Sequence, residues 1–315
     1  MLEFFINEGN EMKRIEHPLP NCWVNAVRPT EAETKYLIDE LGVLPEFVKS
    51  CLDPEESSHI DFDDDEGQTL IMVDYPVEER NDSYYNSDSF QYATSPLGVI
   101  ILKDKIVTIS LNENNILDTF SHNRMRGVDT KYKTRFLLML MLRISQNFLL
   151  YLRRIDKLAN RTEINLHKSM RNKELFQMMR LEKSLVYFST SLKADEITLN
   201  KIVRGKYVKM YEEDQDLFED VMIELHQAED MCNIYSNILS GTMDAFASII
   251  SNNLNIVMKV LTVITIVMSI PNIIFSFYGM NVEGLPFIHA WFPVAISLIA
   301  CAIATYIFYK MDMFH

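Results

Sequence analysis

Residues 257–277 form an apolar stretch that constrains the fold more than any other part of this 315-residue chain. At about 1.5 Å per residue, a helix of this length crosses the hydrocarbon core of a bilayer. A second stretch, residues 292–309, follows after a short loop and is apolar except at Ser297 and Thr305. The sequence therefore predicts two membrane-spanning helices behind a large soluble region. We expect the second helix, which has no polar stripe, to face the lipid bilayer.

The hydroxyl and amide side chains of the first span, with one thioether, recur every three or four residues and so share one face of a helix. They are Asn255, Met258, Thr262, Thr265, Ser269, Asn272 and Ser276, which we call the polar seam. One helix cannot enclose water, so a water-lined path would need several copies of the chain around an axis. The alternative is that small side chains let helices pack closely, and periodicity alone does not separate the two.

The charge of the chain is distributed very unevenly. The first 250 residues carry the whole net charge of −14. The charged residues beyond them are Glu283, Asp312, Lys259 and Lys310, whose charges cancel. Such a surface repels nucleic acid and attracts cations. We therefore expect no nucleic-acid partner.

No group of residues indicates an enzyme. The seven His residues include no HExxH pair, the nine Gly residues form no phosphate-binding loop, and the four Cys residues form no CxxC motif. The sequence therefore predicts no catalytic residues and no resident cofactor, and it argues against an ATP-driven pump. Movement of a cation would have to be passive.

Residues 1–125 are predicted to form an α/β domain with a mainly antiparallel sheet flanked by helices. Strands are expected at residues 22–27, 60–64, 69–75, 97–102 and 106–111, and helices from Thr30 to Gly42 and over residues 45–52. Thr30 and Glu33 have the spacing of a capping box. The acidic run at residues 61–66 lacks EF-hand spacing, so we expect a solvated edge strand and no calcium site. The polar segment 81–92 is expected to be a mobile hairpin loop.

The remaining chain is predicted to be helical. Residues 126–216 form an antiparallel helix pair, and residues 217–278 one stalk helix of about 93 Å whose last part, about 257–278, is the first span. An external loop (279–289), the second span (290–310) and a tail (311–315) follow. Pro271 deprives the Val267 carbonyl of its amide partner, which is tolerable beside a wet pore or a neighbouring helix. Without a signal peptide, both termini are expected on the cytoplasmic side of the cell membrane.

The end of the first span resembles a known family. Residues 278–281 read YGMN, which closes the first membrane helix in the CorA family of divalent-cation channels, and MKVLT at residues 258–262 is similar to that family's pore helix. The resemblance is specific over residues 217–309. It implies an α+β cytoplasmic domain, a long α-helical stalk and two transmembrane helices, assembled as a funnel-shaped homopentamer.

The resemblance also implies a function, the passive transport of divalent cations, with Mg²⁺ as both the transported and the regulatory ion. Asn281, supported by Gly279 and Met280, would form the selectivity filter, and the polar seam with Leu261 would line the pore. Apolar side chains would form the gate, namely Met258, Leu261 and Met268. Asp220, with Glu224 one turn on, would sense cytoplasmic Mg²⁺ against a carboxylate of the next subunit, for which Asp74, Glu78 and Glu79 are candidates.

Two departures from the family pattern leave alternatives open. The loop after GMN reads VEGLPF and lacks the MPEL sequence of magnesium-type members, and the tail after Lys310 lacks their basic cluster. The first alternative is transport of Zn²⁺, Co²⁺ or Ni²⁺ by the same fold, as in the ZntB branch. The second is a two-span membrane scaffold or sensor whose polar seam only packs helices.

Overall fold

The computed structural model describes residues 1–9, 11–79, 91–122, 127–169, 172–204, 208, 210–280, 289 and 291–311. The chain divides into two compact units, Met1–Ser240 and Gly241–His315. The boundary falls inside the longest helix, α6 (Gln215–Tyr278), which is continuous as predicted. The expected hairpin loop at residues 81–92 lies outside the described residues except for its last two.

The first unit is built on one sheet with the strand order β2-β1-β3-β7-β6-β5-β4. The strands are β1 (Leu2–Glu8), β2 (Glu11–Ile15), β3 (Trp23–Val27), β4 (His59–Asp63), β5 (Gln68–Glu79), β6 (Gln91–Ile101) and β7 (Ile106–Ser110). Among the described pairings only β3–β7 is parallel, so the expected mainly antiparallel sheet is confirmed. The acidic run lies on β4 at the sheet edge and in the turn that follows, as predicted.

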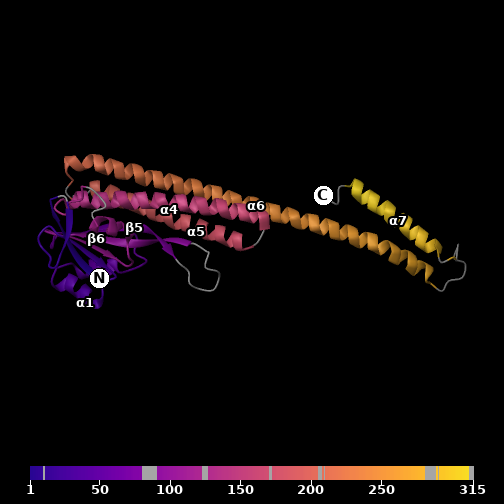
Figure 1. Cartoon of the computed structure of the whole chain (residues 1–315), viewed down its shortest axis with the longest axis horizontal. Coiled ribbons are helices and arrows are strands. Elements are labelled where there is room, and N and C mark those ends of the chain that lie inside the picture. Colours follow the sequence, from indigo (N-terminus) through magenta and orange to yellow (C-terminus); the bar gives the residue numbers. More distant parts are fainter. Residues whose placement is uncertain are drawn as a thin grey trace. The chain divides into compact units, whose positions relative to one another are not determined.

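The sheet is covered by helices on both faces, because its strands are apolar on both sides. Val24 and Ala26 of β3 belong to one core, shared with α1 (Glu31–Asp39) and α2 (Pro45–Cys51). Trp23 points to the other face, where its ring centroid lies 5.3 Å from that of Phe136 on α4 (Lys133–Ser169). On that face α3 (Asn115–Ser121) packs on α4, and α5 (Asn172–Arg204) contacts β5 and β6 (Figure 1).

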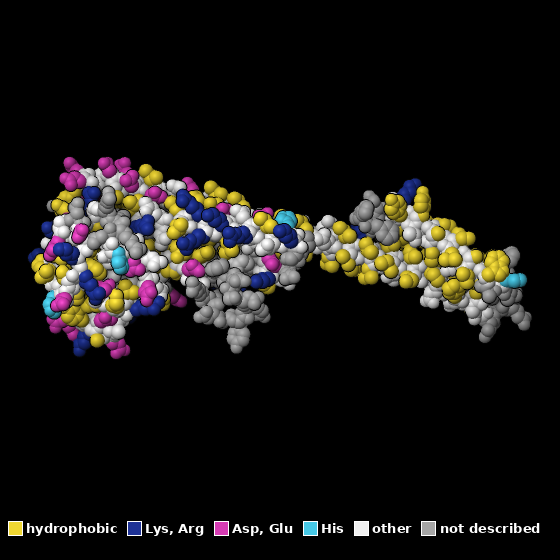
Figure 2. Space-filling model, viewed as in Figure 1, with side chains coloured by type: hydrophobic (Ala, Val, Ile, Leu, Met, Phe, Trp, Pro, Cys, Tyr) yellow, Lys and Arg dark blue, Asp and Glu magenta, His cyan; other side chains and the backbone are white. Residues whose placement is uncertain are grey.

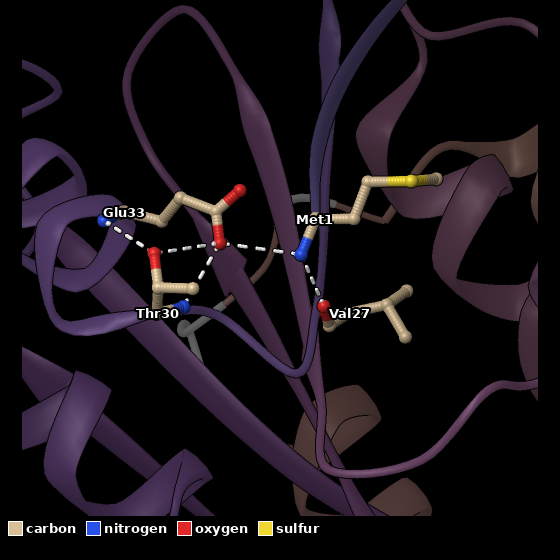
Figure 3. Close-up of polar contacts among 4 residues, drawn as sticks. All are labelled: Met1, Val27, Thr30 and Glu33. Carbon is tan, nitrogen blue, oxygen red and sulfur yellow. Dashed lines mark hydrogen bonds and ion pairs between the residues drawn. The ribbon is translucent and has the colours of Figure 1, made fainter.

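The N-terminus is fixed by the predicted capping box of α1 (Figure 3). The backbone amide of Glu33 donates to the Thr30 hydroxyl, and the Glu33 carboxylate accepts from the Thr30 amide at 2.9 Å. The same carboxylate lies 3.2 Å from the Met1 ammonium group, which also donates to the Val27 carbonyl at 2.6 Å. These contacts hold the first residue of the chain beside β3. Strands β1 and β2 were not predicted.

Helices α4 and α5 pack antiparallel, with the ring centroids of Phe148 and Phe188 5.2 Å apart. One apolar face of α4 is buried, apart from a partly exposed Tyr151; its other members are Phe136, Leu137, Leu140, Ile144 and Phe148. Within the described residues three helices are long and apolar enough to cross a membrane, and α4 is one of them. However, 61% of its apolar window is buried inside the protein, against 6% for each of α6 and α7 (Trp291–Lys310). The apolar residues of α4 therefore serve the core of the soluble unit.

The first part of α6 is packed within the first unit along one face. Its buried side chains are Val221, Leu225, Ala228, Cys232 and Leu239. The Cys232 thiol donates to the Leu185 carbonyl of α5 at 3.2 Å, and the His226 ring lies 3.0 Å from the Glu196 carboxylate. This face thus joins the beginning of α6 to α5.

Two carboxyl groups meet in the interior between β5 and α5. The fully buried Asp195 accepts from the backbone amide of Asp74 at 3.0 Å, and the Ser191 hydroxyl lies 2.5 Å from the Asp74 carboxylate. Burial raises the pKa of Asp195 well above its usual range, and the charge of Asp74 raises it further. Burial also raises the pKa of Asp74. The folded pair therefore retains a proton at pH values where free Asp is ionised.

We predict that Asp195→Asn makes the free energy of unfolding less dependent on pH. The folded wild type holds a proton that the unfolded chain releases above a pH of about 4, so its stability falls as the pH rises from there toward the raised native pKa. Asn keeps the acceptor for the Asp74 amide and has no proton to lose, so the variant gains stability relative to the wild type as pH rises.

Urea unfolding of the full chain, followed by Trp23 fluorescence in a Trp291→Phe background between about pH 5 and pH 8, measures this difference. Asp61→Asn, on the exposed edge strand β4, is the matched control and should leave the pH dependence of the wild type unchanged. Equal pH dependence of the wild type and Asp195→Asn would contradict the prediction.

Candidate cation pathway on the first membrane helix

The second unit contains the rest of α6 and the helix α7, which runs back along it. The ring centroids of Tyr278 and Phe292 are 6.1 Å apart, and the Cys301 sulfur lies 3.6 Å from the Val267 carbonyl oxygen. Figure 2 shows hydrophobic side chains over both helices. Because the two contacts join later residues of α7 to earlier residues of α6, the helices are antiparallel.

The less exposed residues of this part of α6 also recur at helical spacing and so share one side of the helix. Its buried or half-buried members beyond residue 255 are Ile256, Val260, Val263, Val267, Ile270, Pro271, Ile274 and Tyr278, which we call the α7 side. Val263 is 2% exposed, and on α7 Ser297 is 5% exposed. Val267 and Tyr278, which contact Cys301 and Phe292 of α7, both belong to this set. The apolar side of α6 is thus the one that α7 covers.

Every member of the polar seam is exposed in the single chain. Thr265, for example, lies two residues from both Val263 and Val267, and two residues correspond to about 200° around a helix, so it points away from the α7 side. The seam is therefore available for water or for other copies of the chain.

Three hydroxyl groups of the seam already use their hydrogens inside the helix. Thr262 donates to the Met258 carbonyl, Thr265 to the Leu261 carbonyl and Ser269 to the Thr265 carbonyl, each at 2.8 Å. Each hydroxyl oxygen therefore offers only acceptor lone pairs to its surroundings. A hydrated cation directs the hydrogens of its water shell outward, so a row of acceptors suits it.

Pro271 lies on the α7 side and not on the polar seam. Of the two environments expected for it, a wet pore or a neighbouring helix, the structure gives the neighbouring helix. The second span was expected to be apolar except at Ser297 and Thr305, and Cys301 did not stand out because a lone Cys among apolar residues counts as apolar.

The proposed filter begins where α6 ends. The Gly279 amide donates to the Phe275 carbonyl at 2.9 Å, and a Cβ atom at this position would lie only 3.1 Å from that carbonyl oxygen. Met280 follows with 48% exposure. Asn281, the residue expected to contact the ion, lies outside the described residues, as does most of the loop.

The other predicted site residues lie on exposed or partly exposed parts of α6. Met258, Leu261 and Met268 are 53%, 55% and 72% exposed. In the first unit Asp220 is exposed and Glu224 half-buried. Asp74, one candidate partner for them, is half-buried, accepts from the Ser191 hydroxyl and donates its backbone amide to Asp195. Its pairing with another subunit stays a prediction, as do those of Glu78 and Glu79. Among the described residues no three His, Cys, Asp or Glu side chains gather to hold a metal.

Comparison with known proteins identifies the family. The model of the CorA-like Mg²⁺ transporter proteins matches residues 20–310. The chain belongs to this family. A cobalt/magnesium transport protein CorA from Methanocaldococcus jannaschii is 26% identical over 304 residues, covering 91% of this chain and 89% of the relative. The CorA of Thermotoga maritima is 21% identical over 323 residues, covering 98% and 90%.

Solved structures share the fold of the chain. The complete CorA magnesium transporter from Methanocaldococcus jannaschii matches with a TM-score of 0.82 at 22% identity, covering 98% of each chain. Full-length CmaX matches at 0.66 and 14% identity, covering 98% of this chain and 97% of its own. The cytoplasmic domain of ZntB from Vibrio parahaemolyticus matches at 0.56 and 12% identity, covering 80% and 97%. The expected fold is confirmed: an α/β domain, a long helix and a C-terminal helix. The family is one of membrane transporters and not of enzymes.

We predict that single Cys substitutions on the polar seam react with small water-soluble thiol reagents, whereas substitutions off it do not. The seam set is Thr262, Thr265, Ser269 and Asn272, and the set off the seam is Val263, Ile266 and Val267. A Cys301→Ser background removes the only native thiol that is not buried. The rates at which the thiol reagent labels the variants, reconstituted in liposomes, measure the difference between the two sets. Equal rates in both sets would mean that the seam borders no water.

Proposed function

We propose that the chain forms a homopentameric channel for the passive transport of divalent cations, with Mg²⁺ as the transported ion. The observation that carries the proposal is a row of acceptor oxygens on α6 that α7 leaves uncovered in a member of the CorA family. The two curated relatives bear the name cobalt/magnesium transport protein. Several copies of α6 with their polar seams turned to a common axis would enclose a water-lined path.

In this proposal the ion is selected at Asn281. Mg²⁺ gives up its water shell reluctantly, so a ring of amide oxygens would accept hydrogen bonds from the hydrated ion without stripping it. Gly279 would allow close packing below the ring, because no Cβ approaches the Phe275 carbonyl, and Met280 would support the turn. Thr262, Thr265, Ser269, Asn272 and Ser276 would then offer acceptors along the path, with Asn255 at its cytoplasmic mouth.

The gate would be apolar. Met258 and Leu261 lie toward the soluble end of the span, where large side chains from several subunits could close the path by expelling water. Met268 would form a second constriction beside Ser269. The transmembrane potential, acting on a double charge, would drive the ion inward, with the N-terminal unit and the C-terminus in the cytoplasm.

We predict that Asn281→Ala lowers Mg²⁺ flux into liposomes by about tenfold or more, because an unmet hydrogen bond to a charged group costs more than 1.4 kcal/mol. Assembly should be unchanged, since the substitution removes little packing. Asn252→Ala, which changes an exposed amide of α6 outside the polar seam, is the matched control and should transport normally. Flux near that of the wild type in a correctly assembled Asn281→Ala protein would rule out the filter.

A second candidate is transport of Zn²⁺, Co²⁺ or Ni²⁺ by the same assembly. It is supported by the sequence of residues 282–287, which departs from magnesium-type members, and by the fold shared with ZntB. Flux measured side by side with the four ions separates the two candidates, and a membrane scaffold would give no flux with any of them.

Regulation would reside in the first unit. Asp220, which is exposed, and Glu224, which is half-buried, lie near the start of α6. There they would face Asp74, Glu78 or Glu79 of another subunit. Opposed carboxylates repel by about 1 to a few kcal/mol per close pair, and a bound Mg²⁺ would turn this repulsion into attraction. Mg²⁺ bound between these carboxylates would then hold the subunits together and keep the gate closed.

We predict that Asp220→Asn weakens the inhibition of flux by internal Mg²⁺ and the protection of the purified protein by Mg²⁺ against proteolysis. The joint Asp220→Asn, Glu224→Gln variant should lose more of both effects. Asp216→Asn, one turn earlier on α6, is the matched control and should behave as the wild type. If neither variant differs from the wild type, the sensor is not at these residues.

A further inference from the structure

The backbone of α6 has a defect in the middle of the span. Pro271 has no amide hydrogen, so the carbonyl of Val267 cannot make the usual bond to the residue four positions on. Both residues are half-buried on the α7 side. A carbonyl group without a donor is costly in a bilayer, where no water replaces the lost bond.

The donor that reaches this carbonyl comes from the other helix. The Cys301 sulfur lies 3.6 Å from the Val267 oxygen and is placed to donate its hydrogen. Cys301 itself is half-buried, and Ser297, one turn earlier on α7, is 5% exposed. Both side chains are small, which lets α7 approach α6 closely at this level.

The position of this contact gives it a role beyond packing. Residues Thr265 and Ser269 of the polar seam lie on either side of Val267, and Asn272 follows Pro271 directly. A proline break allows the two segments of a helix to change their mutual angle, and that angle sets how the acceptors before and after the break line up. A bond from α7 to the carbonyl at the break restricts this movement.

We propose that Cys301 is a positioning residue for cation transport: its thiol replaces the amide that Pro271 removes and holds α6 against α7 at the break. The thiol contacts neither the ion nor the polar seam, and it acts through the backbone of α6. The flux part of this proposal rests on the proposed transport function, whereas the hydrogen bond itself does not.

The bond is tested first without transport. The S–H stretching band is sensitive to hydrogen bonding and falls where proteins absorb little. In the infrared difference spectrum of the full-length wild type minus Cys301→Ala, the bands of Cys22, Cys51 and Cys232 cancel. We expect a Cys301 band displaced toward that of a bonded thiol, and in a Pro271→Ala background, where the amide is restored, a band displaced toward that of a free thiol. A free-thiol band in the wild type would overturn the proposal even if the channel transports.

The role is tested by a double-mutant cycle on Mg²⁺ flux. Cys301→Ala should lower flux by about three-fold to twenty-fold, the range set by measured hydrogen bonds between membrane helices. Cys301→Ser keeps a donor and should retain most of the flux. In a Pro271→Ala background Cys301→Ala should have little further effect, because the Val267 carbonyl then has its amide.

Thr305→Ala is the matched control, since its hydroxyl bonds to the Cys301 carbonyl of its own helix and not to α6. It should leave flux unchanged. An equal loss from Cys301→Ala in both backgrounds, or an equal loss in Cys301→Ser and Cys301→Ala, would overturn the positioning role. If the wild type itself transports no ion while the infrared shift is present, the transport function fails and the hydrogen bond stands.

Discussion

Backbone carbonyl groups of α6 accept hydrogen bonds from side chains at four levels of the membrane unit, and the arrangement of that unit depends on these bonds. Three come from hydroxyl groups of α6 itself and one from the thiol of α7. In an apolar environment every such group needs a partner. The three hydroxyl groups donate their hydrogens to carbonyls of their own helix, so their oxygens remain on its surface. The Cys301 thiol bonds to the carbonyl at the proline break, on the side of α6 that α7 covers. One side of α6 is thereby polar and uncovered, and the opposite side is apolar and covered.

This division gives a single helix the two surfaces that a channel needs. The α7 side fixes the helix to its neighbour in the same chain, and the polar seam remains for contact with water. The soluble unit has a separate basis for its stability, a sheet that is apolar on both faces, with α4 and α5 on one of them. Because α6 packs on α5 near its start and ends at Tyr278, one continuous helix connects the first unit to the membrane span.

Much of this could be predicted where a local rule decides the structure. The alternation of Ile60 and Phe62 with acidic residues predicts an edge strand, the pair Thr30 and Glu33 predicts a helix start, and the spacing of the polar seam predicts its common face. Strands β1 and β2 were missed because their alternation is interrupted by charged residues, among them Glu3 and Arg14, which pair across the strands at 2.9 Å. Neither the meeting of Asp74 with Asp195 nor that of Cys301 with Val267 could be foreseen, since each depends on how two distant elements align.

In the proposed channel the acceptor oxygens of the polar seam carry a hydrated divalent cation, and Mg²⁺ flux through Thr265→Val measures what one of these oxygens contributes. Valine keeps the shape of threonine but replaces its oxygen with a methyl group. Thr305→Val makes the same change on α7, where the hydroxyl bonds within its own helix. With both proteins reconstituted in liposomes, we expect flux several-fold below that of the wild type for Thr265→Val and unchanged flux for Thr305→Val. Equal flux in both variants and the wild type would contradict the claim that the seam lines the cation path.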